Sequence, residues 1–491
     1  MKNICYFLFV CMIISASMAN GQNFTNIKVN NITSGDQNTD GGNSVAVHNN
    51  NVYLLWQDMG STFFSYVSKS TDGGSTFSNG VKVGGNDPHV FGAITVDNSG
   101  TIYAAWDGIA GEMPNGVYLS KSTDQAATFS APVTVSSDGL FPQVRVFGSN
   151  VYILFCKAKT NNKVGYFFAR STNGGTTFEA PYEITDVTID DVKYDTPDAM
   201  FVDNSGNIYC VWNDGRRTGT GTDIYMAKST NNGTSFSANV LVNDPAGSAD
   251  KIRTGAAIAA VGSNIYVIWR QEDDDHGANR KILFSKSANG GTSFGAEKEI
   301  AFGGSGSPAL TVNSAGEIYI AYPQYSVQQN GVFCAKSNDQ GASFPVTTFI
   351  SGANADAKNP SIFVDAGDAL YAVWTDVRSG NDDVYFAKGT ITITDIAEEE
   401  NIIPAQYELM QNYPNPFNPT TIIKYSIPQS QYVNLKVYDL LGREVISLID
   451  EEVNAGSYEV ELDGSSLTSG IYFYRLQSGT YSETKKLILM K

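Results

Sequence analysis

Charged side chains suited to binding lie in loops that follow aromatic-ended segments of the chain and, for Arg253, in the connection between two repeats at 243–254. They are four arginines and three carboxylates: Arg216, Arg253, Arg270, Arg378, Asp214, Asp376 and Glu272. A guanidinium can bind a ligand carboxylate through two parallel hydrogen bonds, so these residues are the candidate ligand site. Two loops share one pattern, Trp212-Asn213-Asp214-Gly215-Arg216 and Trp374-Thr375-Asp376-Val377-Arg378. The alternative is therefore an Asp–Arg pair that shapes a repeated loop.

The acidic run from Glu272 to Asp275 suggests a second chemistry. Carboxylate oxygens suit Ca²⁺, which makes Asp273, Asp274 and Asp275 candidate calcium ligands, and no other cofactor is expected. The run lacks the spacing of a recognised calcium loop, and a solvated charged turn explains it as well. The histidines lie in separate parts of the chain and predict neither a zinc site nor a His-dependent nucleophile: His48, His89 and His276.

A repeated octapeptide organises the chain around these loops. It is Ser-Thr-Asp-Gly-Gly-Ser-Thr-Phe at 70–77, and related copies occupy 122–129, 171–178, 229–236, 287–294 and 337–344. The third position holds either Asp or Asn: Asp72, Asp124, Asn173, Asn231, Asn289 and Asp339. Asn cannot replace a general acid, but both side chains can accept a backbone N–H two residues on. The octapeptide is therefore expected to be a structural turn.

The octapeptides recur about every 50 residues among short strand patterns, which is typical of propeller blades. An aromatic-ended second strand occurs seven times, near Trp56, Trp106, Phe155, Trp212, Trp269, Tyr322 and Trp374. The seventh unit stops at Gly389 without an octapeptide, and Phe24–Val29 resembles its missing strand. We expect an all-β protein with a seven-bladed propeller closed by that strand, and six blades as the fallback.

In such a blade the octapeptide lies on one face, and the longer loops with the candidate arginines lie on the other. The octapeptides resemble the Asp-box, or BNR, repeats of the sialidase-like propellers. That resemblance implies a glycan-related site in which three arginines hold a sugar carboxylate, a tyrosine paired with glutamate attacks, and an aspartate supplies the acid. The Arg-Ile-Pro segment of sialidases has no counterpart here, and sialidases have six blades, so the catalytic residues are left unassigned.

The chain changes character after residue 393, where a charged linker at 394–404 follows the propeller at 23–393. Residues 405–491 contain alternating strand patterns that predict a small immunoglobulin-like antiparallel β-sandwich. They resemble the type A sorting domain of type IX secretion cargo through the Asn-Pro-rich opening and the motifs that contain Gly442, Arg443, Lys485 and Lys486. The resemblance implies passage through the periplasm, binding to the type IX secretion machinery, and a secreted or surface location.

The ends and the charge of the chain agree with export. Residues 1–19 read as a signal peptide, and no later run is apolar enough for a transmembrane segment. The net charge of −18 argues against nucleic acid as a partner. Cys156, Cys210 and Cys334 lie in separate repeats and are expected to be packed thiols. Three functions remain open: binding of an extracellular glycan or protein, sialidase-like exo-glycoside hydrolysis, and a structural or adhesion role.

Overall fold

The structure is a computed structural model that describes residues 24–30, 36–39, 43–60, 63–84, 89–110, 113–159, 163–186, 189–190, 199–216, 221–244, 251–273, 280–304, 306–325, 330–352, 356–393, 406–412, 414–453 and 456–490. The expected signal peptide and linker lie outside these residues. The chain divides into two compact units, Met1–Ile393 and Thr394–Lys491. The described residues form strands, turns and loops, so none of them belongs to a helix that could cross a membrane.

The described part of the first unit contains seven antiparallel sheets, numbered here in chain order. Sheet 1 contains β2 (Gln37–Asn38), β3 (Val45–His48), β4 (Asn51–Asp58), β5 (Phe64–Ser70) and β6 (Val81–Lys82). Sheet 2 contains β7 (His89–Val96), β8 (Ile102–Ala110), β9 (Met113–Ser122) and β10 (Val133–Ser136). Sheet 3 contains β11 (Leu140–Phe147), β12 (Asn150–Lys159), β13 (Lys163–Ser171), β14 (Tyr182–Glu183) and β15 (Ile189–Asp190).

The remaining four sheets of this unit follow the same order. Sheet 4 contains β16 (Ala199–Val202), β17 (Ile208–Asp214), β18 (Asp223–Ser229) and β19 (Val240–Leu241). Sheet 5 contains β20 (Ile252–Val261), β21 (Asn264–Glu272), β22 (Lys281–Ser287) and β23 (Lys298–Phe302). Sheet 6 contains β24 (Ala309–Val312), β25 (Ile318–Gln324), β26 (Gly331–Ser337) and β27 (Val346–Phe349). Sheet 7 contains β28 (Ala357–Val364), β29 (Ala369–Asp376), β30 (Asp383–Thr390) and β1 (Thr25–Lys28).

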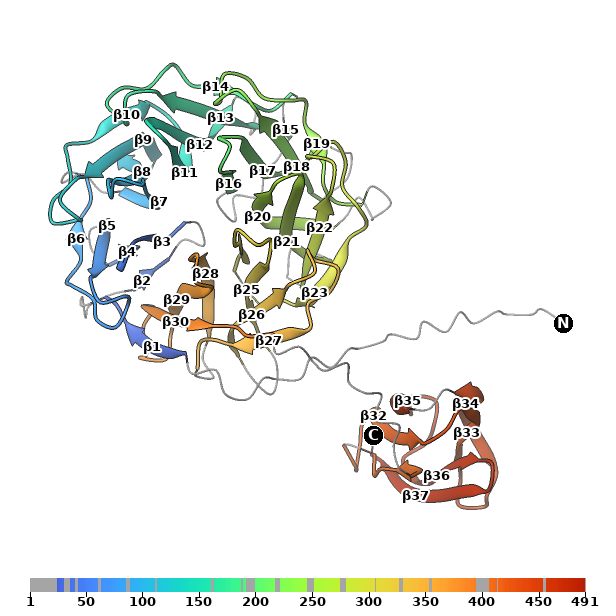
Figure 1. The fold of residues 1–491 in the computed structure, drawn as a ribbon. Coiled ribbons are helices and arrows are strands. Elements are labelled where there is room, and N and C mark those ends of the chain that lie inside the picture. The colour runs from blue at the N-terminus through green and yellow to red at the C-terminus, as the bar shows by residue number, and fades with distance from the viewer. Residues whose placement is uncertain are drawn as a thin grey trace. The chain divides into compact units, whose positions relative to one another are not determined.

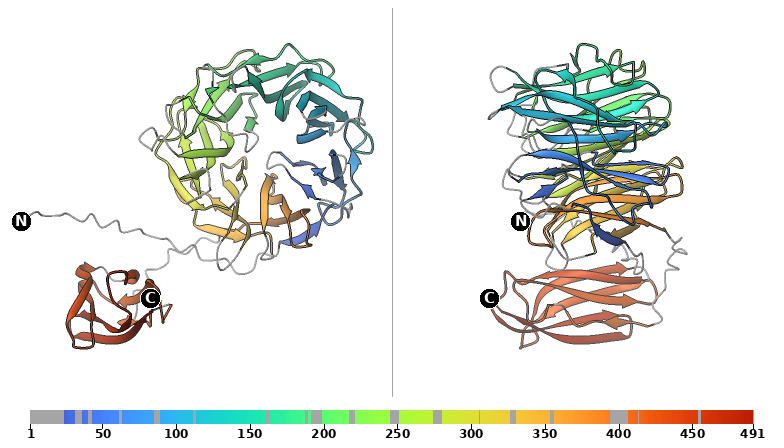
Figure 2. Two further views of the ribbon diagram at one scale, coloured as in Figure 1. Left: turned by 180° about the vertical axis from the view of Figure 1, so that it is seen from behind. Right: turned by 90° about the vertical axis from the view of Figure 1, so that its left-hand side faces the viewer.

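The sheets stand around a common centre (Figure 1; Figure 2 shows the ring from behind and from the side). The innermost strands touch in a closed sequence: β3 contacts β7, followed by β11, β16, β20, β24, β28 and again β3. The expectation for the amino-terminal strand is confirmed, because Thr25–Lys28 pairs with Lys388 to Tyr385 of β30. This pairing joins the two ends of the unit and covers a sheet edge that would otherwise be open.

The core between neighbouring sheets comes from the alternation of apolar residues along the second and third strands. Trp56, Trp212, Trp269 and Trp374 are almost fully buried at the corresponding position of four second strands. Cys156, Cys210 and Cys334 are buried thiols without a disulfide, as expected. Burial raises the pKa of the Cys334 thiol, so this group stays neutral.

The octapeptides form turns that bond to themselves. In the first copy, Thr76 donates its backbone N–H to Asp72 Oδ1 (2.9 Å) and its hydroxyl to Asp72 Oδ2 (2.6 Å). In the third copy, Thr177 N donates to Asn173 Oδ1 (3.0 Å), and Asn173 Nδ2 donates to Thr177 Oγ1 (2.9 Å). The main acceptor bond therefore spans four residues instead of the expected two. Asn serves as well as Asp because the Thr hydroxyl can either donate or accept.

Each octapeptide also packs against the preceding sheet. The Phe77 ring meets Phe386 of sheet 7 at 5.0 Å between centroids, and Phe344 meets Phe284 of sheet 5 at 5.3 Å. The fifth position adopts positive φ, with 98° at Gly74 and 63° at Ala126. A Cβ on Gly74 would lie only 2.4 Å from the Phe386 ring, so glycine here serves both the turn and the close approach.

The second unit contains two sheets that share one core. One sheet contains β31 (Glu408–Leu409), β32 (Thr420–Ile427) and β35 (Gly456–Asp463). The other contains β34 (Glu444–Val453), β33 (Gln431–Tyr438), β36 (Gly470–Ser478) and β37 (Tyr481–Leu489). Ile423 and Leu462 from the first sheet and Leu435 and Leu476 from the second belong to the same buried cluster. The sequence predicted strands at 421–427, 433–438, 458–462, 471–476 and 485–489. It did not predict β34, because the acidic residues and mostly exposed side chains of this strand hide the alternation.

Candidate functional site

The antiparallel order of each sheet separates two faces of the first unit. The octapeptides, which join third to fourth strands, lie at the same ends as the turns that join first to second strands; we call this the turn face. The loops from second to third strands and the connections between sheets lie at the opposite ends, which we call the loop face. Loops carried by a rigid sheet are where binding groups usually reside. Arg216 and Arg378 follow second strands, Arg270 lies near the loop-face end of β21, and Arg253 lies near the start of β20.

Arg216 is held by its own sheet. Its Nε and Nη2 donate to Asp214 Oδ2 at 2.9 and 2.6 Å, and its guanidinium lies over the Tyr225 ring at 4.0 Å. Nη1 also donates to Asp186 at 2.6 Å. Burial alone would lower the pKa of Arg216, but the bonds to Asp214 and Asp186 raise it. The group is thus a fixed cation whose donors are directed at protein carboxylates.

Arg378 repeats this arrangement in sheet 7. Its Nη2 bonds to Asp376, which is fully buried, and its guanidinium lies over the Tyr385 ring at 4.3 Å. Nη1 donates to Asn26 Oδ1 of the amino-terminal strand at 2.9 Å. In both sheets the tryptophan two residues before the aspartate donates its indole N–H to that carboxylate, at 3.2 Å from Trp212 and 3.1 Å from Trp374. We call this Trp, Asp, Arg and Tyr arrangement the arginine clasp.

The other two arginines are also engaged with protein groups. Arg253 is 1% exposed, and its Nη1 donates to Thr222 O at 3.1 Å and approaches Asp223 Oδ1 at 3.4 Å. Arg270 Nε lies 2.8 Å from Glu272 Oε1, which also accepts from Arg280 Nε at 3.1 Å. Each of the four predicted arginines therefore faces a carboxylate of its own sheet or of the preceding sheet. This geometry favours the loop-shaping alternative and does not supply guanidiniums free to grip a sugar acid.

The calcium candidates are only partly described. Asp273 forms an ion pair with Lys251, while Asp274 and Asp275 lie outside the described residues. Within the described part of the chain, no group of three or more His, Cys, Asp or Glu side chains has an arrangement that could hold a metal ion. His48 bonds to the backbone of Asn98, and His276 lies outside the described residues.

The sequence reasoning missed a pair of aromatic residues on the innermost strands. Phe91 of β7 and Phe141 of β11 pack at 4.6 Å between ring centroids with planes 58° apart, and both are half-buried. Both have positive φ, 41° and 54°, which is unusual for bulky residues and strained. No sequence signal reports a backbone angle, so only the fold could reveal them.

Their strain comes from β-bulges that recur around the ring. The register of β7 shifts between Val90 and Gly92, and that of β11 shifts between Leu140 and Gln143. The same shift in β20 and β28 places Gly255 (φ 63°) and Asn359 (φ 52°) at the corresponding position. Those two types tolerate positive φ, whereas Phe does not. The bulges lie toward the loop-face ends of these strands, so two neighbouring sheets present strained aromatic rings there.

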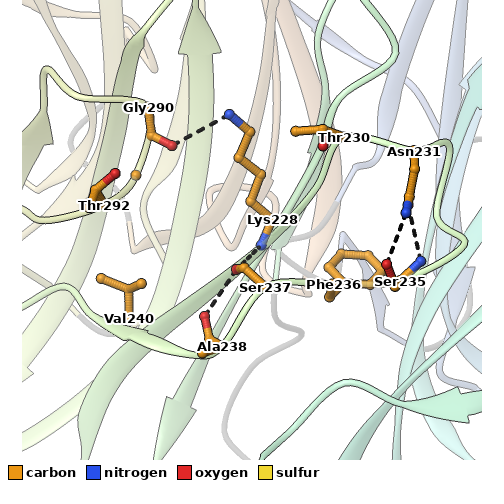
Figure 3. Close-up of a pocket in the computed structure, with 11 residues that line it drawn as sticks. Lys228, Thr230, Asn231, Ser235, Phe236, Ser237, Ala238, Val240, Gly290 and Thr292 are labelled. Carbon is orange, nitrogen blue, oxygen red and sulfur yellow. Dashed lines mark hydrogen bonds between the residues drawn. The ribbon is translucent and has the colours of Figure 1, made fainter.

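A groove of about 540 Å³ lies on the turn face, between the octapeptides of sheets 4 and 5 (Figure 3). Lys228, Phe236 and Val240 line one side, and Gly290, Gly291 and Thr292 line the other. Lys228 Nζ reaches across to Gly290 O at 3.4 Å. The groove is thus the seam between two sheets, and its lining contains neither a general base nor a paired carboxylate.

The comparisons first identify the class of fold. A polysaccharide lyase of family PL25, an ulvan lyase bound to -[GlcA(1-4)Rha3S]-, matches with a TM-score of 0.51 at 12% identity over 74% of this chain and 95% of that chain. A Hadza microbial sialidase matches with a TM-score of 0.42 at 12% identity over 69% and 73%. A protein of unknown function from Dyadobacter fermentans matches with a TM-score of 0.44 at 14% identity over 62% and 95%. The chain is all-β, with a propeller-type first unit.

The family comparison is specific for the end of the chain. Residues 411–490 match the secretion system C-terminal sorting domain. The second unit is therefore a type IX sorting domain, its partner is the type IX secretion machinery, and the protein is exported to the cell surface or the medium. No curated protein matches the sequence.

Proposed function

We propose that the first unit is a seven-bladed Asp-box propeller that binds an extracellular carbohydrate on its loop face after export. In this proposal the seven sheets are the blades at 23–393, and 405–491 is an immunoglobulin-like sandwich that serves as the export address. A signal peptide at 1–19 directs the first step of export, into the periplasm. The fold shared with a polysaccharide lyase is compatible with this function but does not carry it.

The observation that carries the proposal is the strained pair of Phe91 and Phe141. A bulky residue at positive φ costs about 1–2 kcal/mol, and strain of this kind collects at binding sites. Two half-buried rings beside each other offer an apolar surface against which the C–H face of a sugar can pack, as aromatic rings do in binding pockets. Polar loops around them would supply the hydrogen bonds that select the sugar.

The test is a glycan array probed with the secreted protein and with a Phe91→Asn, Phe141→Asn double variant. Asn already occupies the corresponding bulge at Asn359, so relief of the backbone strain should offset part of the packing that Phe141 loses against the core, and a melting curve checks that the variant is folded. Binding should weaken at least tenfold. The control is Phe302→Asn, which removes a 63% exposed ring elsewhere in the unit and should leave binding unchanged.

Three outcomes separate the candidate functions. Absence of binding by the wild type across the array overturns the carbohydrate proposal. Equal binding by the double variant and the wild type overturns the aromatic site alone. Turnover of a fluorogenic sialoside would favour the sialidase-like alternative, which the arginine clasps do not support because Arg216 and Arg378 already bind Asp214 and Asp376.

A further inference from the structure

Exposed apolar side chains are concentrated in the sorting domain. Among the described residues, nine large apolar side chains are exposed, and seven of them lie in the second unit: Met410, Tyr432, Leu440, Leu441, Val445, Ile471 and Met490. The much longer first unit contributes only Phe63 and Phe302. Single exposed apolar residues are ordinary, but a group of them in so small a unit indicates a contact surface.

Strand register brings most of this group to one end of the four-stranded sheet. Tyr438, the last residue of β33, pairs with Phe473, so the turn that carries Leu440 and Leu441 follows at the end of the sheet where β36 begins. Ile471 pairs with Ile488, and Leu489 with Gly470, so Met490 follows at the same end. Val445, the second residue of β34, lies at this end too, because Glu444 pairs with Tyr438. We call Leu440, Leu441, Val445, Ile471 and Met490 the apolar sheet end.

The most exposed part of this surface is held in one conformation. Leu440 is 68% and Leu441 is 79% exposed, at the tip of the turn between β33 and β34. Asp439 Oδ1 accepts the backbone N–H groups of Leu441 and Arg443, both at 2.9 Å. Asp439 Oδ2 accepts from Arg443 Nε at 2.7 Å, and Gly442 turns the chain with φ of 75°. A preformed tip loses little further freedom when it binds.

We propose that the apolar sheet end inserts into an apolar pocket on a protein of the type IX secretion machinery. The sorting domain has that machinery as its partner, and recognition needs a surface that is exposed in the folded domain. Turns normally carry polar residues at their tips, so two adjacent leucines are unusual there. Because both leucines are mostly exposed, they contribute little to the domain's own core. In this arrangement Asp439, Gly442 and Arg443 hold the turn, while the leucines make the contact.

The experiment uses the full chain in a bacterium that has a type IX system. The Leu440→Ser, Leu441→Ser double variant should lower the amount of protein outside the cell at least tenfold and leave it in the periplasm. Leu440→Met, Leu441→Met keeps the apolar surface and should be exported normally. The matched control is Met410→Ser at a 41% exposed apolar residue that follows β31 of the other sheet, and this variant should also be exported.

The interpretation depends on folding being intact. Because both leucines are mostly exposed, the purified double variant should melt at the wild-type temperature; if it does not, Leu441→Ser alone provides the same test at the most exposed position. Normal export of the folded serine variant overturns the proposal. If export is normal while the wild type, but not the variant, forms dimers in solution, the surface is a contact between copies of this chain and the proposal fails.

Discussion

Arg170 Nη1 donates to Thr234 Oγ1 at 2.7 Å and so joins the third strand of sheet 3 to the octapeptide of sheet 4. The residue just before each octapeptide is basic, and several of these residues also donate a hydrogen bond to the next sheet. Lys69 binds Gln125, Lys121 binds Gly174 and Lys286 binds Gln340, each in the octapeptide of the next sheet. The octapeptide turns thus supply the acceptors of hydrogen bonds between neighbouring sheets.

Replacing Arg170 with Met should lower the free energy of unfolding by about 1–2 kcal/mol, because hydrogen bonds from a charged donor to the next sheet are lost. Urea unfolding monitored by tryptophan fluorescence measures this change. Glu179→Gln is the control, since Glu179 is a half-exposed partner of Arg170 within the same sheet and its loss should cost less than about 1 kcal/mol. An equal loss in both variants would contradict a role for Arg170 between sheets.

The carboxylate octapeptides should make stability fall in acid. Hydrogen bonds from Thr128 and Ser122 lower the pKa of Asp124 to about 2, below its usual value near 4. The contribution of this group is therefore complete above about pH 4 and is lost as the pH falls through about 2. Asp124→Asn should flatten the dependence of the melting temperature on pH in this window.

The reverse exchange provides the control for this effect. Asn173 makes the corresponding turn without a titrating group. Asn173→Asp should therefore add acid sensitivity between about pH 4 and 2 and leave the melting temperature at pH 7 nearly unchanged. No change in the pH profile of either variant would refute the assignment of these bonds.

Loss of a buried carboxylate in an arginine clasp should strongly lower the free energy of unfolding. Asp214→Ala leaves the Arg216 guanidinium and the Trp212 indole N–H without their shared acceptor, and removal of one member of a buried pair costs about 3–5 kcal/mol. The free energy of unfolding from urea titration measures the loss. Asp186→Asn removes the outer, 41% exposed partner and should cost less than about 1 kcal/mol. Comparable costs would mean that Arg216 is not organised around Asp214.

Ring closure depends on the amino-terminal strand. Val29 is buried and donates its backbone N–H to Val384 O at 2.8 Å. Val29→Pro removes this donor and should lower the free energy of unfolding by about 2–4 kcal/mol through the unpaired carbonyl and lost packing. Thr25→Pro removes a ladder bond only at the end of β1, where Thr25 pairs with Lys388, and should cost less than Val29→Pro. Limited proteolysis at the amino end would detect the opened seventh sheet; equal resistance of both variants would argue against closure by this strand.

The sequence by itself determined the all-β class, the propeller-type repeat, the closing strand predicted at Phe24–Val29 and the sorting domain. These features depend on local patterns, since alternation builds strands and the octapeptide bonds within itself. The sequence also explained why Asp72 in one octapeptide corresponds to Asn173 in another. It predicted a hydrogen bond to the backbone N–H two residues on, whereas the structure shows one to the backbone N–H four residues on. Strand β34 was not predicted, because its exposed and acidic residues do not alternate with apolar ones in a regular way.

Only the tertiary structure decided what the candidate site residues touch. The chain cannot show that Arg378 meets Asn26, which is 352 positions away, or that Arg253 is buried against sheet 4. It also hides the positive φ of Phe91 and Phe141, because backbone strain is imposed by the bulge and its neighbours rather than by residue type. The exposure of Leu440 and Leu441 is also a property that only the tertiary structure shows. The sequence places two leucines in a turn, and the packed domain leaves them 68% and 79% exposed.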